Sequence, residues 1–124
     1  MTYPSDLRYT NDHEWIRTGA TCVVGITQFA VDQLGDITLV DLPREGDLIT
    51  KGQRFGTIES VKSVSDLYAP ISGTVTKVNA ALKDSPELVN QDPYNEGWMI
   101  EIEPTERGEL DELLAADAYA ALAQ

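Results

Sequence analysis

The sequence is poor in the residues from which cross-links and metal sites are built, with one cysteine and one histidine in 124 residues. The single cysteine, Cys22, cannot form an intrachain disulfide, and its apolar neighbours favour a buried, inert thiol. The single histidine, His13, excludes a multi-histidine metal site, and no cysteine or histidine cluster has metal-ligand spacing. Glycine motifs for phosphate or dinucleotide binding are also absent, so any nucleotide chemistry would be done by partners.

Positive charge is scarce as well: 9 lysines and arginines stand against 21 acidic residues, a formal net charge of −12. Such a surface repels phosphate backbones and anionic lipids, so neither nucleic acid nor membrane is an expected partner. It can steer the protein towards basic faces on other proteins. The sequence lacks a signal segment, a transit segment and a membrane-length apolar run, which predicts a cytoplasmic, bacterial protein. A processed chain from the mitochondrial matrix would look the same.

What the sequence does contain is a series of short apolar or alternating runs between turn residues. They predict strands at residues 14–17, 21–26, 37–42, 55–61, 73–78 and 98–102. In the last run, Trp98, Ile100 and Ile102 are predicted to share one face of a strand, with Met99 and Glu101 on the other.

Two helical segments are expected beside the strands. Thr27 can cap a short helix over residues 27–34, and Gly35 suits the residue that ends it. Leucines near helical spacing beyond Glu109 predict a C-terminal helical segment packed on the sheet. The length suits one core. The sequence therefore predicts a single, mainly β domain over residues 1–124.

One lysine lies near the middle of two potential strands in the segment of residues 55–68. If the chain turns there, Lys62 stands at the tip of a hairpin and is exposed to a modifying enzyme. Acylation would remove its charge and place a new group on a long flexible stem. By spacing alone, however, Lys62 is equally well an ordinary surface cation.

The residues around Lys62 resemble a known family. The segment Ile58-Glu59-Ser60-Val61-Lys62, followed by Ser65-Asp66 and by Pro70-Ile71-Ser72-Gly73-Thr74-Val75, is similar to the lipoyl-lysine region of glycine cleavage H proteins. Further landmarks occur in the family's order over nearly the whole chain, which a chance motif would not produce. They are His13-Glu14-Trp15, Val24-Gly25-Ile26-Thr27, Leu34-Gly35-Asp36, Leu88-Val89-Asn90, Pro93-Tyr94, Gly97-Trp98 and Glu109-Leu110-Asp111-Glu112-Leu113-Leu114.

The resemblance implies a lipoyl/biotinyl-type β sandwich, a flattened barrel with a protruding lysine hairpin. It implies that the protein is not an enzyme but a carrier, with lipoic acid covalently attached to Lys62. The expected partners are the pyridoxal-phosphate-dependent glycine decarboxylase, which loads an aminomethyl group, the tetrahydrofolate-dependent aminomethyltransferase and dihydrolipoyl dehydrogenase. A lipoate ligase or octanoyltransferase would modify the lysine.

The resemblance also implies a cleft that shelters the loaded arm from water, with a carboxylate to pair with the cargo's ammonium group. By family position, the candidates are Glu14 and Asp66. Each has a plainer interpretation. Glu14 could be a solvated carboxylate at a strand end, and Asp66 could cap a turn of the hairpin. His13 is expected to position the strand that contains Glu14, and Trp15 and Trp98 are expected in the core.

Four other functions are alternatives to this one. A biotin carrier would have methionine on both sides of the lysine, where this chain has Val61 and Ser63. A lipoyl domain of a 2-oxoacid dehydrogenase would have aspartate before the lysine and a linker to a catalytic domain. A lipoate relay that donates lipoyl groups to other complexes stays open, because Lys62 would serve both roles. A small enzyme using His13, Glu14 and Asp66 would be active without lipoate.

Overall fold

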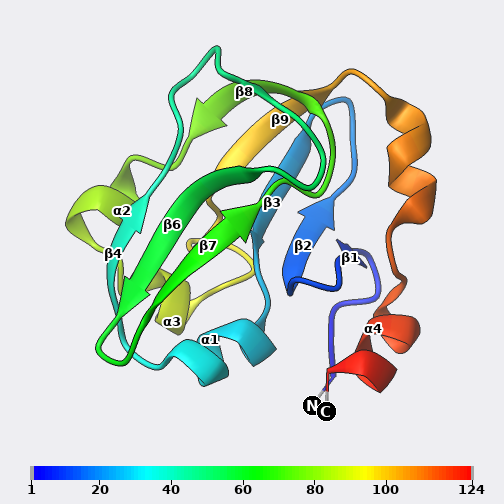
Figure 1. Cartoon of the computed structure of the whole chain (residues 1–124). Coiled ribbons are helices and arrows are strands. Elements are labelled where there is room, and N and C mark those ends of the chain that lie inside the picture. The colour runs from blue at the N-terminus through cyan, green and yellow to red at the C-terminus, as the bar shows by residue number, and fades with distance from the viewer. Residues whose placement is uncertain (1, 124) are drawn as a thin grey trace.

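Two antiparallel sheets of unequal size form the frame of the molecule (Figure 1). The computed structural model describes residues 2–123. Within that range the larger sheet has the strand order β1-β2-β3-β9-β8-β5, and the smaller has the order β4-β6-β7. The strands are β1 Arg8–Tyr9, β2 Glu14–Arg17, β3 Cys22–Ile26, β4 Ile37–Asp41, β5 Leu48–Ile49, β6 Arg54–Ser60, β7 Val64–Tyr68, β8 Gly73–Val78 and β9 Ile100–Pro104. The expected mainly β fold is confirmed.

Five of the six predicted strands begin and end within one residue of observed ones, but the sixth was placed too early. β9 begins at Ile100, so the predicted alternation fails for Trp98 and Met99. The Met99 side chain is fully buried, and its N–H donates to the Val24 carbonyl at 2.8 Å. Trp98 is only half-buried. From Ile100 onward the prediction holds, since Ile100 and Ile102 both face the core.

Short helices lie around the sheets, with α1, α3 and α4 at the lower end in Figure 1. The helices are α1 Gln28–Leu34, α2 Ala81–Asp84, α3 Leu88–Gln91 and α4 Ala116–Leu122, with the 3-10 helix η1 at Arg107–Glu112. The prediction for residues 27–34 is confirmed, because the Thr27 hydroxyl accepts from the Ala30 N–H at 3.3 Å and caps α1. The predicted C-terminal segment is two pieces. Leu114 separates them because it exchanges two backbone hydrogen bonds of 2.8 Å with Tyr9.

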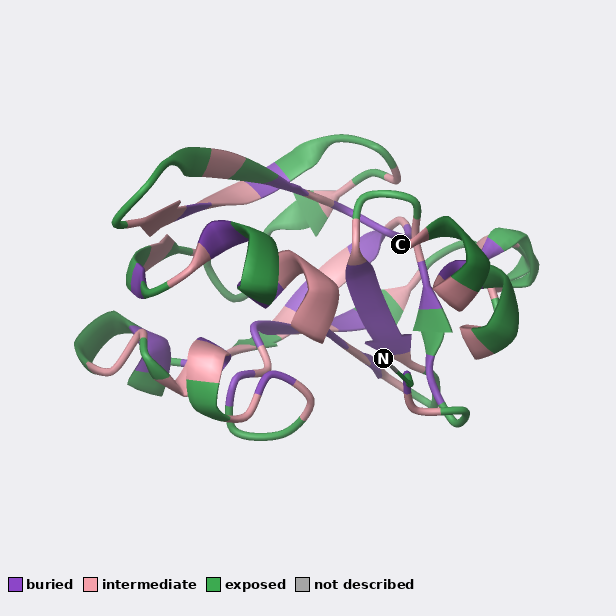
Figure 2. Ribbon diagram, turned by 90° about the horizontal axis from the view of Figure 1, so that it is seen from below, coloured by how far each residue is buried: buried purple, intermediate pink, exposed green. Residues whose placement is uncertain are grey.

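The core lies between the sheets, where buried residues concentrate on the strands, while the outermost turns are exposed (Figure 2). Ile58 and Leu67 of the small sheet face Val24, Val75 and Ile102 of the large one. Burying a side chain of this size stabilises the fold by about 1.5–3 kcal/mol before entropy is counted. A second buried cluster lies under α4 and contains Tyr3, Leu7, Tyr9, Trp15 and Tyr119. Cys22 is buried, as predicted.

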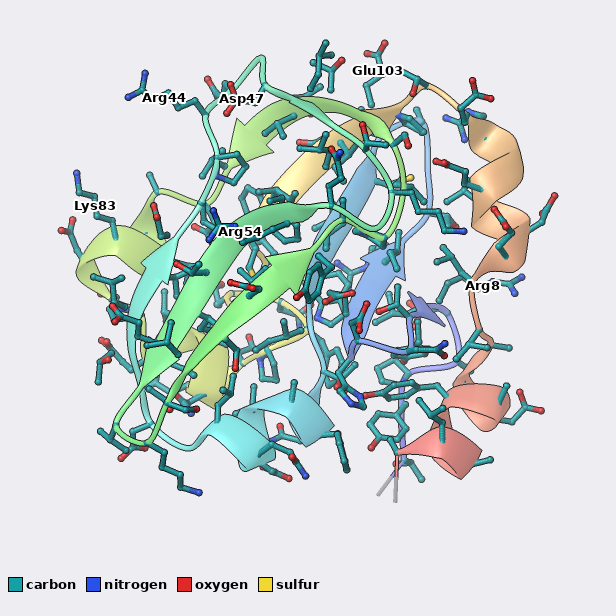
Figure 3. The ribbon with its side chains drawn as sticks, viewed as in Figure 1. Arg8, Arg44, Asp47, Arg54, Lys83 and Glu103 are labelled. Carbon is teal, nitrogen blue, oxygen red and sulfur yellow. The ribbon has the colours of Figure 1, made fainter. Side chains whose placement is uncertain are left out.

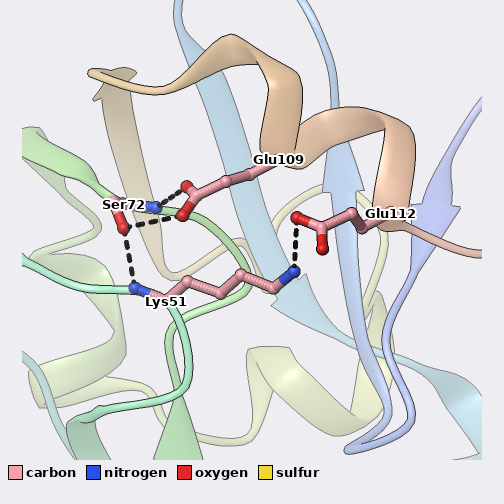
Figure 4. A network of polar contacts seen from close by, with 4 residues as sticks. All are labelled: Lys51, Ser72, Glu109 and Glu112. Carbon is pink, nitrogen blue, oxygen red and sulfur yellow. Dashed lines mark hydrogen bonds and ion pairs between the residues drawn. The ribbon is translucent and has the colours of Figure 1, made fainter.

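Polar contacts fasten η1 to the turns of the sheets (Figure 4). The Glu109 carboxylate accepts from the N–H of Ser72 at 2.6 Å and from its hydroxyl at 3.0 Å. Lys51 donates its backbone N–H to Ser72 Oγ at 2.9 Å, and its ammonium lies 2.9 Å from Glu112. Most other charged side chains project outward, as Arg8, Arg44, Lys83 and Glu103 do in Figure 3.

Candidate functional site

Lys62 lies at the exposed tip of the β6–β7 hairpin (Figure 1). The turn is closed by a hydrogen bond of 2.8 Å from the Ser60 N–H to the Ser63 carbonyl. The Ser60 hydroxyl accepts from the N–H groups of both Lys62 and Ser63 at 3.2 Å. A serine here therefore satisfies the turn's own donors, which keeps the tip ordered while the Lys62 side chain extends from it.

The hairpin tip is held against the end of α1. Val61 donates its N–H to the Asp36 carbonyl at 3.1 Å. Gly35 has φ +79°, and a Cβ added there would lie 3.4 Å from Cε of Lys62, so the lysine stem runs beside the backbone of Gly35. Asn90 of α3 braces this turn, because it donates to the Gly35 carbonyl at 2.8 Å and accepts from the Ile37 N–H at 2.9 Å.

A cavity of about 180 Å³ opens next to this turn, between α1 on one side and the β6–β7 hairpin on the other. Four separate segments contribute to its wall. The lining residues are Asp12, His13, Glu14, Ile26, Ala30, Gln33, Leu34, Ile58, Ser65, Asp66 and Leu67. Leu34, the last residue of α1, immediately precedes the glycine beside which the Lys62 stem lies.

Glu14 is the buried acid of this cavity, with only 2% of its surface exposed. Its carboxylate accepts from the Thr10 hydroxyl at 2.6 Å. Burial raises the pKa of the Glu14 carboxyl from its usual 4.5 to about 7, an effect strengthened by Asp12 and opposed by hydrogen bonds from Thr10 and the Tyr68 backbone. The interpretation of Glu14 as a solvated strand-end carboxylate is therefore wrong.

Asp66, the second carboxylate candidate, has different surroundings. It lines the cavity, but 45% of its side chain is exposed, and Oδ1 lies 3.8 Å from Nη1 of Arg54. Arg54 lies on the outward side of the small sheet (Figure 3). Oδ2 accepts from the Tyr68 hydroxyl at 3.4 Å. The structure thus brings Glu14 and Asp66 to one cavity but buries only Glu14.

His13 lines the cavity with its backbone in the left-handed region, at φ 70°. Its Nδ1 lies 2.7 Å from the Tyr119 hydroxyl of α4, and its ring lies 4.7 Å from that of Phe29. Burial lowers the pKa of His13, with Asp12 acting in the opposite direction.

Three residues of the site were not predicted from the sequence: Thr10, Gln33 and Tyr119. The bracing role of Asn90 was not predicted either. None of these residues lies close in sequence to Lys62, and Tyr119 reaches the site only through long-range packing. For Thr10, the only sequence signal was its position four residues before Glu14. Asn90 stood in a family landmark, but its contact with Gly35 was not foreseen.

Within residues 2–123, no helix is long and apolar enough to cross a membrane. The same residues contain no group of three or more histidine, cysteine, aspartate or glutamate side chains able to hold a metal ion.

Comparison with known proteins gives one consistent result. The family model described as Glycine cleavage H-protein matches residues 7–124. A probable glycine cleavage system H protein of Haloarcula marismortui is 56% identical over 117 residues, covering 94% of this chain and 92% of the relative. A glycine cleavage system H protein of Anaeromyxobacter sp. (strain K) is 54% identical, covering 100% of this chain and 98% of the relative.

A solved structure agrees in fold. The crystal structure of a glycine cleavage system H protein from Mycobacterium marinum superposes with a TM-score of 0.89 at 43% sequence identity, covering 96% of this chain and 97% of that one. The expectation of a lipoyl-type sandwich is confirmed by this match.

Proposed function

The chain belongs to the glycine cleavage H-protein family, and from this premise we propose that it is the lipoyl carrier of the glycine cleavage system, with lipoic acid bound as an amide to Nζ of Lys62. The position of Lys62 is the observation that supports this attachment site. It is exposed at a hairpin tip, and its stem runs beside Gly35 at the end of the helix that lines the cavity.

The residues present suit a lipoyl arm. A cavity of about 150 Å³ holds a benzene-sized molecule, so a volume of about 180 Å³ suits a dithiolane ring. Ile26, Leu34, Ile58 and Leu67 supply apolar lining, and Glu14 supplies an acid. When bound, the lipoyl group supplies a ring disulfide whose sulfur accepts the one-carbon fragment as the ring is reduced.

Glu14 would recognise the cargo through charge. With its pKa near 7, the carboxyl changes protonation easily around neutral pH. An ammonium group nearby favours the ionised form, so Oε1 and Oε2 would hold the amine while the apolar walls exclude water. Asp66 would act at the cavity mouth, where solvent screens its charge.

The remaining parts of the proposal follow the family. A single carrier domain over residues 1–124 would exchange cargo with the decarboxylase, the aminomethyltransferase and the dehydrogenase, and would catalyse none of these steps itself. A lipoate ligase or octanoyltransferase would modify Lys62. The relatives named above come from bacteria and an archaeon, which supports the cytoplasm as the compartment. They are named for glycine cleavage, so we retain this function over a lipoate relay.

Reconstitution with the three partner enzymes tests the proposal. The lipoylated wild type should sustain repeated release of carbon dioxide from glycine, whereas the unlipoylated protein and Lys62→Arg should not. Lys83→Arg, which alters another exposed lysine, controls for a general effect of the substitution. Full turnover by Lys62→Arg would overturn the proposal. So would activity of the unlipoylated chain, which would favour the small enzyme.

A further inference from the structure

The hydroxyl of Tyr119 in the C-terminal helix α4 lies between His13, which lines the cavity, and Thr27, the N-cap of α1. It is 2.7 Å from Nδ1 of His13 and 2.7 Å from Oγ1 of Thr27. Tyr119 and Thr27 are both fully buried. The Tyr119 ring stacks on Tyr9 at 4.8 Å with an interplanar angle of 11°, and it meets Tyr3 edge-on at 4.8 Å. This packing leaves the hydroxyl little freedom to move.

Counting hydrogens gives the bonds a direction. Thr27 Oγ1 accepts from the Ala30 N–H, and within residues 2–123 the only acceptor for its own hydrogen is the Tyr119 oxygen. Burial raises the pKa of Tyr119 to about 12, so its hydroxyl keeps its hydrogen at neutral pH. That hydrogen then points to Nδ1 of His13. If Nδ1 were the donor instead, one buried hydroxyl hydrogen would be left without a partner, which is costly.

The two residues joined through Tyr119 are neighbours at the end of the β2–β3 pair, where the Thr27 N–H donates to the His13 carbonyl at 3.0 Å. His13 adopts a left-handed backbone conformation, which costs a non-glycine residue free energy and persists only when its surroundings enforce it. Thr27 caps α1, whose residues Ala30 and Leu34 line the cavity. The bridge from α4 therefore adds a side-chain link to the backbone hydrogen bond that joins the start of α1 to His13.

We propose that Tyr119 is a positioning residue of the arm cavity: by accepting from Thr27 and donating to His13 Nδ1, it fixes His13 as the neutral Nε2–H tautomer and sets the orientation of its ring. Nδ1 is thereby occupied, so Nε2 is the ring nitrogen left for a ligand in the cavity. This inference rests on the proposed function only in taking the lipoyl arm as that ligand.

Nitrogen NMR of the unlipoylated protein tests the hydrogen bonds without involving the arm. His13 is the only histidine, so its two ring nitrogens are assigned without ambiguity. The wild type at pH 8 should show the Nε2–H tautomer with a hydrogen-bonded Nδ1. Tyr119→Phe keeps the ring and should shift the Nδ1 resonance. A wild type with its hydrogen on Nδ1 overturns the inference even if Tyr119→Phe does not fold.

Tyr9→Phe is the matched control. Tyr9 is equally buried in the same aromatic cluster, and its hydroxyl donates to the Pro4 carbonyl at 2.6 Å, with no bond to His13. It should lose stability to a similar extent but leave the His13 resonances unchanged. Thr27→Ser keeps the hydroxyl and should give nearly wild-type His13 resonances. An equal response of the His13 resonances to Tyr9→Phe and Tyr119→Phe would mean a merely structural role and overturn the inference.

Retention of cargo provides a second measurement. Hydrolysis of the aminomethyl group consumes water and releases formaldehyde and ammonia, leaving the dithiol. Loss of the bridge should speed ammonia release from the loaded carrier about fivefold in Tyr119→Phe, because buried partners are left unpaired, and not in Tyr9→Phe. If the wild type itself retains cargo no longer than a small-molecule aminomethyl thioether, the proposed sheltering function fails. If the wild type retains it and Tyr119→Phe retains it equally, only the present inference fails.

Discussion

The lysine hairpin and the arm cavity would carry the two halves of the proposed chemistry, and the chain builds them in different ways. The hairpin turn is made by consecutive residues, with the Ser60 hydroxyl satisfying the N–H groups of the turn that presents Lys62. The cavity needs four segments between residues 12 and 67, and its bracing contacts come from Tyr119 and Asn90. Attachment chemistry is thus local, whereas the proposed shelter for the cargo depends on the whole fold.

The ionisable groups of the two regions also differ in their exposure to water. Lys62 is exposed to water, so its charge contributes little to stability. Glu14 is buried at the cavity, so its ionisation costs folding free energy. We therefore expect substitutions in the hairpin to change modification and those in the cavity to change stability, pH dependence and cargo retention.

The largest stability effect is expected at Glu14. Its folded-state pKa is raised, so the wild type loses stability as the pH rises from the unfolded value of 4.5 to about 7. The loss amounts to about 3 kcal/mol. Glu14→Gln keeps an acceptor for Thr10 but does not ionise. In urea unfolding, the free energy of unfolding of the variant relative to that of the wild type should therefore rise by about this amount between pH 4 and pH 8.

Glu103→Gln, which removes an exposed acid, controls for the loss of one negative charge and should show no such divergence. Parallel pH profiles for the wild type and Glu14→Gln would contradict the burial argument. Despite its greater stability at pH 8, Glu14→Gln should release ammonia from the loaded arm faster than the wild type does.

A smaller effect is expected where the two regions meet, at Gly35. Its φ of +79° with ψ −151° is a conformation that residues with a Cβ rarely adopt, so Gly35→Ala should lose about 2 kcal/mol of stability. The added Cβ would also contact the Lys62 stem at 3.4 Å. We expect Lys62 to be lipoylated several-fold more slowly in Gly35→Ala than in the wild type, with the reaction monitored by mass spectrometry.

Gly46→Ala provides the comparison, because Gly46 has φ +91° but nothing within 4 Å of an added Cβ. It should lose stability without slowing lipoylation. Equal lipoylation rates in the two variants would show that the hairpin and the turn after α1 act independently.

The smallest effect is expected for Asp66→Asn. Its carboxylate is 45% exposed and lies 3.8 Å from Arg54, so screening makes the pair weak. The unfolding free energy should change by less than about 0.5 kcal/mol, and cargo retention by less than about twofold. A loss of retention as large as that of Glu14→Gln would mean that the carboxylate turns into the cavity when the arm is loaded.

The parts of the fold set by local sequence could be predicted. Alternating runs gave five strands to within one residue, and Thr27 with Gly35 marked α1. The hairpin around Lys62 followed from two potential strands flanking a lysine. The role proposed for Glu14 came from family resemblance, because no local pattern distinguishes it among 21 acidic residues.

The errors arise where distant contacts override a local pattern. Leucine spacing suggested one C-terminal segment, but the pairing of Leu114 with Tyr9 divides it. Alternation suggested a strand from Trp98, but Met99 is buried in the core and β9 begins only at Ile100. The Tyr119 bridge joins residues 106 and 92 positions apart, a separation at which sequence periodicity carries no information.

The central claim, that Lys62 carries the arm, is tested most directly by intact and peptide mass spectrometry after incubation with lipoate and a lipoate ligase. We expect one lipoyl group, located on Lys62, and none on Lys62→Arg. An unmodified wild type beside a fully modified control substrate, or a lipoyl group on another lysine, would contradict it.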